Sequence, residues 1–393
     1  MSFFGLFLCL AVFAIGDILG VGTRAKLSSV FVALMLFLIG FLTGIFPKNI
    51  IEQAGLSQIA KWASPFIIFH MGTMINFKEL IKEWRTVVLS IIAMGVAAIS
   101  IFAVLPIIGK ESVIVSIPII NGGIVATQIM TEGAMAKGLS QAAALGAIIY
   151  AVQKFVGTPP ASIFGLKEAN ILIEKYRGGL IEKGASSVDE GRENRQKNKD
   201  VKFFYQKYDK YFTPFTCLGV TAFFAWLSRF LESLTPVNYS IWALLLGAIM
   251  GYIGLVPPKI LEKGNSAGLL QMAIFASIIP SLADINILDL AKLSLQTAFI
   301  FAVVLIGIFI FIYLLPLWKI VGSKNLAVGI SMAQLLGFPA TYLIANEIAT
   351  AVAKNEEERE LILSKIMPAY VVAGFASVTT LSIVVAGIFV KFL

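Results

Sequence analysis

A short stretch inside an apolar region combines a helix-breaking glycine pair with polar side chains. The glycines are Gly122 and Gly123, and the polar residues are Asn121, Thr127 and Gln128. A helix break at membrane depth leaves backbone amides and carbonyls unpaired, and lipid cannot satisfy them. Such groups must be buried in protein or line a water-filled cavity. Amides at a helix start can bind an anion, while freed oxygens can ligate a desolvated sodium ion.

A second stretch near the other end of the chain repeats this pattern. It contains Gln334, Gly337, Pro339 and Thr341, and both stretches read Gly-x-x-Ala-Thr with a polar amide a few residues before the glycine. Two such breaks at matching places in two halves indicate the binding site of a transporter. We therefore expect both stretches to contact substrate. The alternative is packing, because small residues also let helices approach closely.

Ionisable side chains near these stretches are further candidates, because they are costly at membrane depth and usually face a cavity. Glu132 follows the first stretch, and Asn346 and Glu347 follow the second. Each is expected to bind a coupling cation, unless it lies in water at the mouth of its segment. Lys154, in the middle of an apolar span, is expected to hold an anionic substrate, to pair with Glu132 or to replace a bound cation. The alternative is a lysine that extends to the membrane interface.

Four hydroxyl side chains complete the candidate set for ion coupling. Thr158 precedes Pro159-Pro160, a pair that would kink the span and free carbonyl groups. Ser377, Thr379 and Thr380 occupy the corresponding region of the last span. The alternative for each hydroxyl is a hydrogen bond to its own helix backbone.

The composition is that of a protein with several membrane spans. Of 393 residues, 58% are hydrophobic and 14% are charged, and a soluble protein so apolar could not cover its surface. The formal net charge of +8 does not indicate a nucleic-acid partner, because the basic residues lie in short loops between apolar spans. Cys9 and Cys217 both lie in apolar segments, so we expect free thiols. The single histidine, His70, excludes a histidine metal cluster.

Apolar runs of about 18–25 residues predict ten spanning helices, five in each half of the chain. The spans are predicted near residues 3–20, 27–46, 57–76, 86–108, 139–163, 213–233, 239–256, 267–283, 295–318 and 362–391. Each half also holds a broken apolar segment, 112–137 and 325–351, whose arms are about half a bilayer long and predict a re-entrant helical hairpin. Residues 166–211 form a charged cytoplasmic linker between two membrane repeats, 1–165 and 212–393.

The two halves match residue by residue at a constant offset of 210. Matches between apolar residues carry little information in such a chain, whereas matches at glycine, proline and asparagine carry more. The informative matches are Gly44/Gly254, Pro47/Pro257 and Asn76/Asn286.

Five spans per half is an odd number, so the halves must have opposite orientations in the membrane. The basic residues agree: with a cytoplasmic linker, the loops on its side include Arg24, Lys26, Lys78 and Lys82, and the opposite side holds few. Both termini are then extracytoplasmic, the first span is a retained helix, and the two hairpin tips meet near the midplane.

This organisation resembles the glutamate:sodium symporter family and, more distantly, the 2-hydroxycarboxylate transporters. Residues 121–127, Asn-Gly-Gly-Ile-Val-Ala-Thr, stand where that family has a Gly-Gly-x-Gly-Thr-type loop, although Ile-Val-Ala replaces its small and polar residues. Residues 337–346 resemble its second loop, a Gly-x-x-Pro-Thr-Ala-x-Ala-Asn-type run. The resemblance implies sodium coupling, a small carboxylate substrate, and movement of one domain against a dimerising scaffold, hence a homodimer.

We therefore expect a secondary active transporter of the cell membrane that carries a small organic anion, such as a glutamate-like amino acid or another carboxylate, with sodium. The alternatives are proton coupling or antiport with Lys154 as the titrating group, and a channel. An intramembrane enzyme would need a nucleophile with a base or a metal cluster, and one histidine without a His-Glu-x-x-His motif argues against it. We expect no resident cofactor, only transient sodium.

Overall fold

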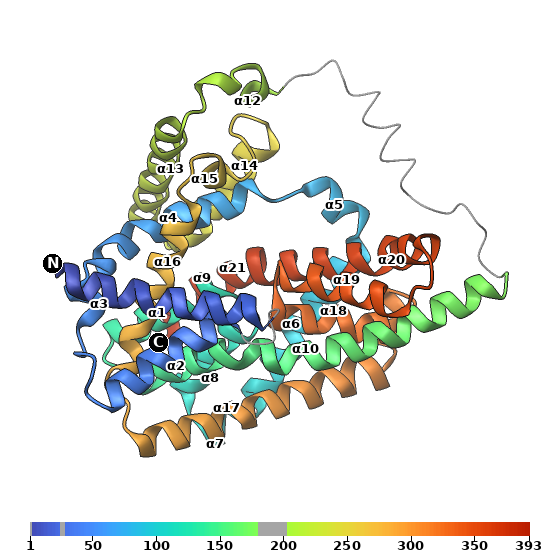
Figure 1. Ribbon diagram of the computed structural model, residues 1–393, viewed down its shortest axis with the longest axis horizontal. Helices are drawn as coiled ribbons and strands as arrows, with labels where there is room; N and C mark the ends of the chain where they lie inside the picture. The colour runs from blue at the N-terminus through green and yellow to red at the C-terminus, as the bar shows by residue number, and fades with distance from the viewer. Residues whose placement is uncertain (1, 24–27, 180–202) are drawn as a thin grey trace.

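The computed structural model describes residues 2–23, 28–179 and 203–393, which form helices and loops and contain no strand (Figure 1). The prediction of an all-α protein is thus confirmed for these residues. Five helical stretches are long and apolar enough to cross a membrane, which is typical of a membrane protein. They are Phe3–Gly22 (α1), Trp84–Ala103 (α6), Pro214–Leu234 (α13), Ile287–Leu314 (α17, Ile287–Ile308, with η3, Phe309–Leu314) and Glu356–Phe392 (α20 to η6).

The other five predicted spans are shorter or less apolar helices. They are Ser29–Leu42 (α2), Leu56–Thr73 (α4), Ser140–Arg177 (α10), Tyr239–Tyr252 (α14) and Ala267–Ile278 (α16) continued by Ile279–Leu282 (η2). Helices α2 and α14 stop earlier than predicted because a glycine with left-handed backbone follows each. These are Gly44, with φ +73°, and Gly254, with φ +71°.

Short helical segments connect the long ones, and side-chain caps fix several of their starts. The Asn76 side chain accepts a hydrogen bond from the Glu79 amide, and Asn286 accepts one from the Asp289 amide. Nδ1 of the buried His70 accepts a hydrogen bond from the Leu261 amide, so this side chain contributes to packing between helices. The short segments are Ile50–Gln53 (α3), Phe77–Lys82 (α5), Leu105–Ile108 (α7), Phe204–Lys207 (α12), Asp209–Tyr211 (η1), Ile260–Lys263 (α15) and Pro316–Ile320 (η4).

Both predicted helix breaks are present. Helices Lys110–Ile120 (α8) and Ile124–Ala136 (α9) are joined through residues 121–123. Helices Lys324–Leu336 (α18) and Ala340–Val352 (α19) are joined through residues 337–339. The outer limits differ by two residues or fewer from the predicted 112–137 and 325–351.

Helix α10 continues past the predicted start of the linker at residue 166 and ends at Arg177. The helix also continues through Pro159 and Pro160. Its end is held by Arg177, whose Nε and Nη2 each donate to a Glu358 carboxylate oxygen at 2.8 Å. Residues 180–202 of the linker, together with Arg24 and Lys26, lie outside the described residues.

The last span is not a uniform helix. It consists of Glu356–Gly374 (α20), the π-helical Phe375–Leu381 (η5), Ser382–Phe389 (α21) and Val390–Phe392 (η6). The π-helix contains all three hydroxyl residues singled out above in this span, Ser377, Thr379 and Thr380. Single π turns inside α-helices occur frequently at functional sites.

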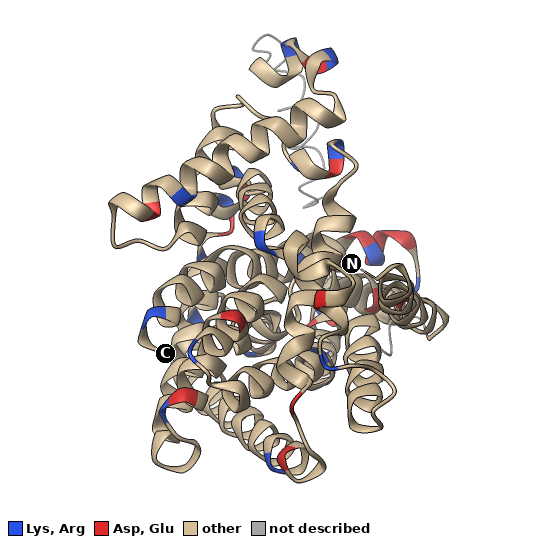
Figure 2. Ribbon diagram, turned by 90° about the vertical axis from the view of Figure 1, so that its left-hand side faces the viewer, with Lys and Arg blue, Asp and Glu red and all other residues tan. Residues whose placement is uncertain are grey.

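The helices pack as two bundles, each built from both halves of the chain. In the first bundle, α4 packs on α14, α16 and α13, and α1 packs on α2. In the second bundle, α10 packs on α18, α9 and α8, while α20 packs on α18 and α19, α17 on α6, and α21 on α9. Figure 1 shows α13 and α14 toward one end of the molecule and α10, α18 and α20 toward the other. In Figure 2, the acidic and basic residues gather mainly at helix ends and in loops.

Candidate functional site

The two helix breaks line one cavity of about 440 Å³ between the bundles. From the α8–α9 break come Gly122 and Gly123, and from the α18–α19 break come Gly337, Phe338 and Pro339. The first bundle closes the cavity with side chains of α1, α2, α4 and α16. Two segments more than 200 residues apart in the sequence therefore share one space.

The π-helix η5 lies between the two breaks. A Cβ placed on Gly123 would lie 2.8 Å from Val378 Cγ1, and one placed on Gly337 would lie 2.9 Å from the same atom. Gly337 also has φ +66° and ψ 174°, a conformation that residues with a side chain essentially never adopt. Both breaks need glycine because one valine packs against both of them.

The start of α9 gives the cavity wall a positive character. Its first residues, Ile124 and Val125, line the cavity, and its N-cap, Gly123, offers no side-chain cap. The first amides of a helix point away from the helix without partners and carry its positive end. Lys154 of α10 lines the same cavity. Among the described residues, no carboxylate forms an ion pair with Lys154.

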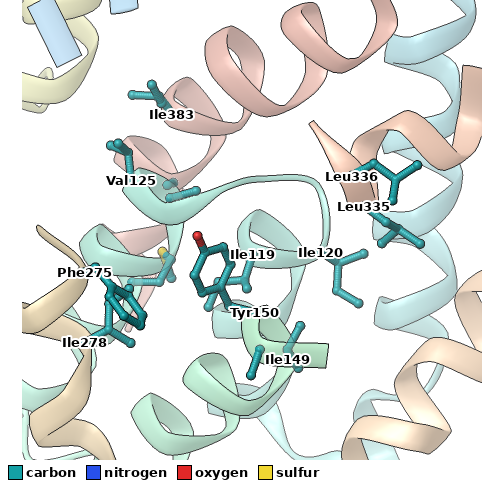
Figure 3. Packing of buried hydrophobic residues seen from close by; sticks show 14 of the residues in the cluster. Ile119, Ile120, Val125, Ile149, Tyr150, Phe275, Ile278, Leu335, Leu336 and Ile383 are labelled. Carbon is teal, nitrogen blue, oxygen red and sulfur yellow. The ribbon is translucent and has the colours of Figure 1, made fainter. Parts of the chain in front are cut away.

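Gln153 is a cavity residue that sequence reasoning missed. Its side chain is 2% exposed, its Nε2 donates to the Gly122 carbonyl at 3.0 Å, and its Oε1 has no partner. Its position beside Lys154 in an apolar span was the signal that could have identified it. Figure 3 shows Tyr150, one turn earlier on α10, near Val125 and Phe275, which also line the cavity.

Five predicted substrate residues are buried without lining the cavity. They are Asn121, Thr127, Gln128, Gln334 and Thr341. Buried polar atoms normally have hydrogen-bond partners. In this set the atoms that have none are Asn121 Oδ1, Gln128 Oε1, Thr341 Oγ1 and both amide atoms of Gln334. Four of these five atoms are oxygens that are free to ligate a cation.

Most of the candidate hydroxyls bond back to their own helix. Thr127 donates to the Gly123 carbonyl at 3.0 Å, Thr158 to Lys154 at 2.7 Å and Ser377 to Ala373 at 2.6 Å. Thr380 donates to the Phe375 carbonyl at 3.5 Å. Thr379, in contrast, lines the cavity beside Val378.

The predicted carboxylates do not lie between the two breaks. Glu132 is exposed and accepts a hydrogen bond from Gln128 Nε2 at 3.0 Å. Asn346 donates to the Tyr342 carbonyl at 3.1 Å. Glu347 and Thr158 line an adjoining cavity of about 780 Å³, which shares Lys154 and Pro339 with the first one. Lys154 thus lies where the two cavities meet.

No group of three or more His, Cys, Asp or Glu residues that could hold a metal ion occurs in the part of the chain that the structure describes. No protein-family model matches the chain, and no curated protein matches it either.

Proposed function

We propose that this protein is a secondary active transporter that moves a small carboxylate together with sodium by alternating access. The observation that carries the proposal is the shared cavity, because broken helices from two separate halves line it at the boundary of two bundles. Transporters built from inverted repeats bind their substrates between such broken helices.

Local structure that recurs at the offset of 210 supports the inverted repeat, in which α8–α9 and α18–α19 are the re-entrant hairpins of this proposal. Helices α2 and α14 have the same length at this offset, and so do α3 and α15. The left-handed glycines Gly44 and Gly254 and the capping residues Asn76 and Asn286 recur at it too. Five spans per half then give the halves opposite orientations, with a cytoplasmic linker and extracytoplasmic termini in the cell membrane.

The substrate carboxylate binds at the positive wall of the cavity in this proposal. Lys154 supplies a full charge, the α9 amides supply oriented donors, and Gln153 positions the Gly122 carbonyl. Such charge-assisted hydrogen bonds are about twice as strong as neutral ones. Gly122, Gly123, Gly337 and Pro339 contribute backbone rather than side chains.

In this proposal, sodium binds next to the breaks but away from the cavity, where buried side-chain oxygens have no hydrogen-bond partner. The oxygens of Gln334 and Thr341 serve one ion, and Thr379 adjoins the break. Because the sodium ion neutralises the charge of the approaching carboxylate, binding of the ion favours binding of the substrate, and the reverse. Movement of the second bundle against the first, as part of a homodimer, then exposes the cavity to either side.

Uptake into proteoliposomes tests the proposal. With a panel of radiolabelled carboxylates, a sodium gradient is expected to drive concentrative uptake, and an equal potassium gradient is not. Lys154→Gln is expected to weaken uptake strongly. Currents of channel size without saturable counterflow would overturn the proposal.

Proton coupling is a second candidate, favoured by the position of Lys154 between two cavities without an ion-pair partner among the described residues. It predicts uptake that needs no sodium and whose pH dependence disappears in Lys154→Gln.

A further inference from the structure

The cavity contains one basic and one acidic side chain among its described lining residues. The basic residue is Lys154 of α10, and the acidic one is Asp17 of α1. The adjoining cavity adds Glu347 and, among the described residues, no further basic side chain. The described walls therefore provide the positive charge for one carboxylate, and Asp17, which lines the same cavity as Lys154, opposes a second.

The wall that the first bundle contributes to the cavity is largely apolar. Phe13, Met71, Met272 and Phe275 line the cavity from α1, α4 and α16. The rings of Phe13 and Phe275 pack at 5.3 Å between centroids, and Phe13 packs further on Phe37 at 5.6 Å. Aromatic pairs at this spacing form a firm apolar surface.

A second carboxylate placed against these apolar side chains would lose its water, and the polar residues of this wall, Ser29 and Gln271, offer it only neutral partners beside Asp17. Burial of a charge without an opposite charge is very costly. An alkyl or aromatic group would instead displace water from apolar surface, which is favourable. Methionine adapts its flexible thioether to irregular ligands. The wall from the first bundle thus selects for an apolar group.

We infer that the site takes a monocarboxylate with an apolar body and discriminates against dicarboxylates. This inference rests on the proposed function and narrows its substrate class. Lys154 and the start of α9 hold the single carboxylate, and the apolar body contacts Met272 and Phe275. Asp17 disfavours a second negative charge.

Two matched pairs of acids test the inference. The pairs are 4-methylpentanoate with glutarate and leucine with glutamate, so each pair exchanges an apolar end for a second carboxylate. Thermal stabilisation of the purified protein in sodium, and inhibition of counterflow, are measured for all four, because a ligand of the folded state raises the melting temperature. In each pair that binds, the monocarboxylate is expected to bind at least tenfold more tightly than the dicarboxylate.

The outcomes are distinguishable. A dicarboxylate that binds more tightly than its monocarboxylate partner in either pair would overturn this inference and leave the proposed function standing. If none of the four acids stabilises the protein or inhibits counterflow, the carboxylate function itself fails, and this inference with it.

Two variants sharpen the test. Met272→Lys places a second basic residue in the apolar wall and is expected to shift the preference at least tenfold toward glutarate, whereas the volume-conserving Met272→Leu is expected to keep it. If Met272→Lys does not fold, Asp17→Asn serves, because Asp17 is exposed and its change leaves packing intact. Asp17→Asn is expected to improve binding of glutarate severalfold relative to that of 4-methylpentanoate, and an unchanged ratio would contradict the role of Asp17.

Discussion

The two helix breaks that meet at the cavity differ in how far their polar groups are satisfied. At the α8–α9 break, Asn121 Nδ2 donates to the Ile117 carbonyl at 2.9 Å, and Gln153 donates to the Gly122 carbonyl. At the α18–α19 break, neither amide atom of Gln334 has a partner, and Thr341 Oγ1 has none. The first break therefore makes side-chain hydrogen bonds, although Asn121 Oδ1, Gln128 Oε1 and Gln153 Oε1 have no partner. The Gln334 and Thr341 side chains of the second break make none.

The largest expected effects come from the break glycines, and they separate the two breaks. Gly123→Ala and Gly337→Ala are each expected to abolish most uptake, since both Cβ atoms would strike Val378. Adding Val378→Ala is expected to restore uptake in Gly123→Ala, because the φ of −112° at residue 123 suits alanine. It is not expected to restore uptake in Gly337→Ala. The latter retains a backbone strain of about 1–3 kcal/mol. Uptake in proteoliposomes measures this, with Gly95→Ala as a control because a Cβ there would meet no atom of another helix within 4 Å. Equal rescue of both would contradict the comparison.

Stability is expected to change by different amounts at the two breaks. Gln334→Leu removes two unpartnered buried atoms, so the sodium-free protein is expected to gain about 1–3 kcal/mol, the desolvation cost of such a group. The same variant is expected to lose its stabilisation by sodium. Asn121→Leu removes a made hydrogen bond together with one unpartnered oxygen, so its gain is expected to be about 1 kcal/mol smaller. Apparent melting temperatures in sodium and in potassium test both, and destabilisation by Gln334→Leu would show that its amide already has partners.

Affinity is expected to depend on Gln153. Gln153→Leu removes the hydrogen bond to the Gly122 carbonyl and loosens the start of α9, so the substrate KM is expected to rise about tenfold, equivalent to about 1.4 kcal/mol. Gln141→Leu is the matched control, because Gln141 is an exposed glutamine on the same helix. A KM unchanged in Gln153→Leu would remove this residue from the site.

The smallest effects are expected at the exposed carboxylates. Glu132→Gln and Glu347→Gln are expected to change uptake less than about threefold, because solvent screens exposed charges. Sodium titrations of uptake check this. Loss of sodium dependence in either variant would mean that a carboxylate, and not the buried amides, ligates the coupling ion.

The helix breaks could be predicted from the sequence because their cause is local. Gly122-Gly123 and Gly337 with Pro339 interrupt apolar runs, and their effect needs no knowledge of the rest of the chain. The cavity walls could not be predicted in the same way. Gln153 and Val378 acquire their roles only when α10 and η5 pack beside both breaks, and that depends on contacts between distant segments. Helix α10 extends beyond the span predicted near 139–163, because the contact of Arg177 with Glu358 holds its polar end as a helix.

The chain passes from one bundle to the other through residues 74–83, 180–202 and 283–286, and the last of these connections is the shortest. The five peptide links from Leu282 to Ile287 reach roughly 17–18 Å when fully extended. This connection therefore acts as a tether, and it sets an upper limit on how far the end of η2 and the start of α17 can separate during the proposed cycle. A larger displacement would have to unwind the first turn of α17, which the Asn286 cap opposes.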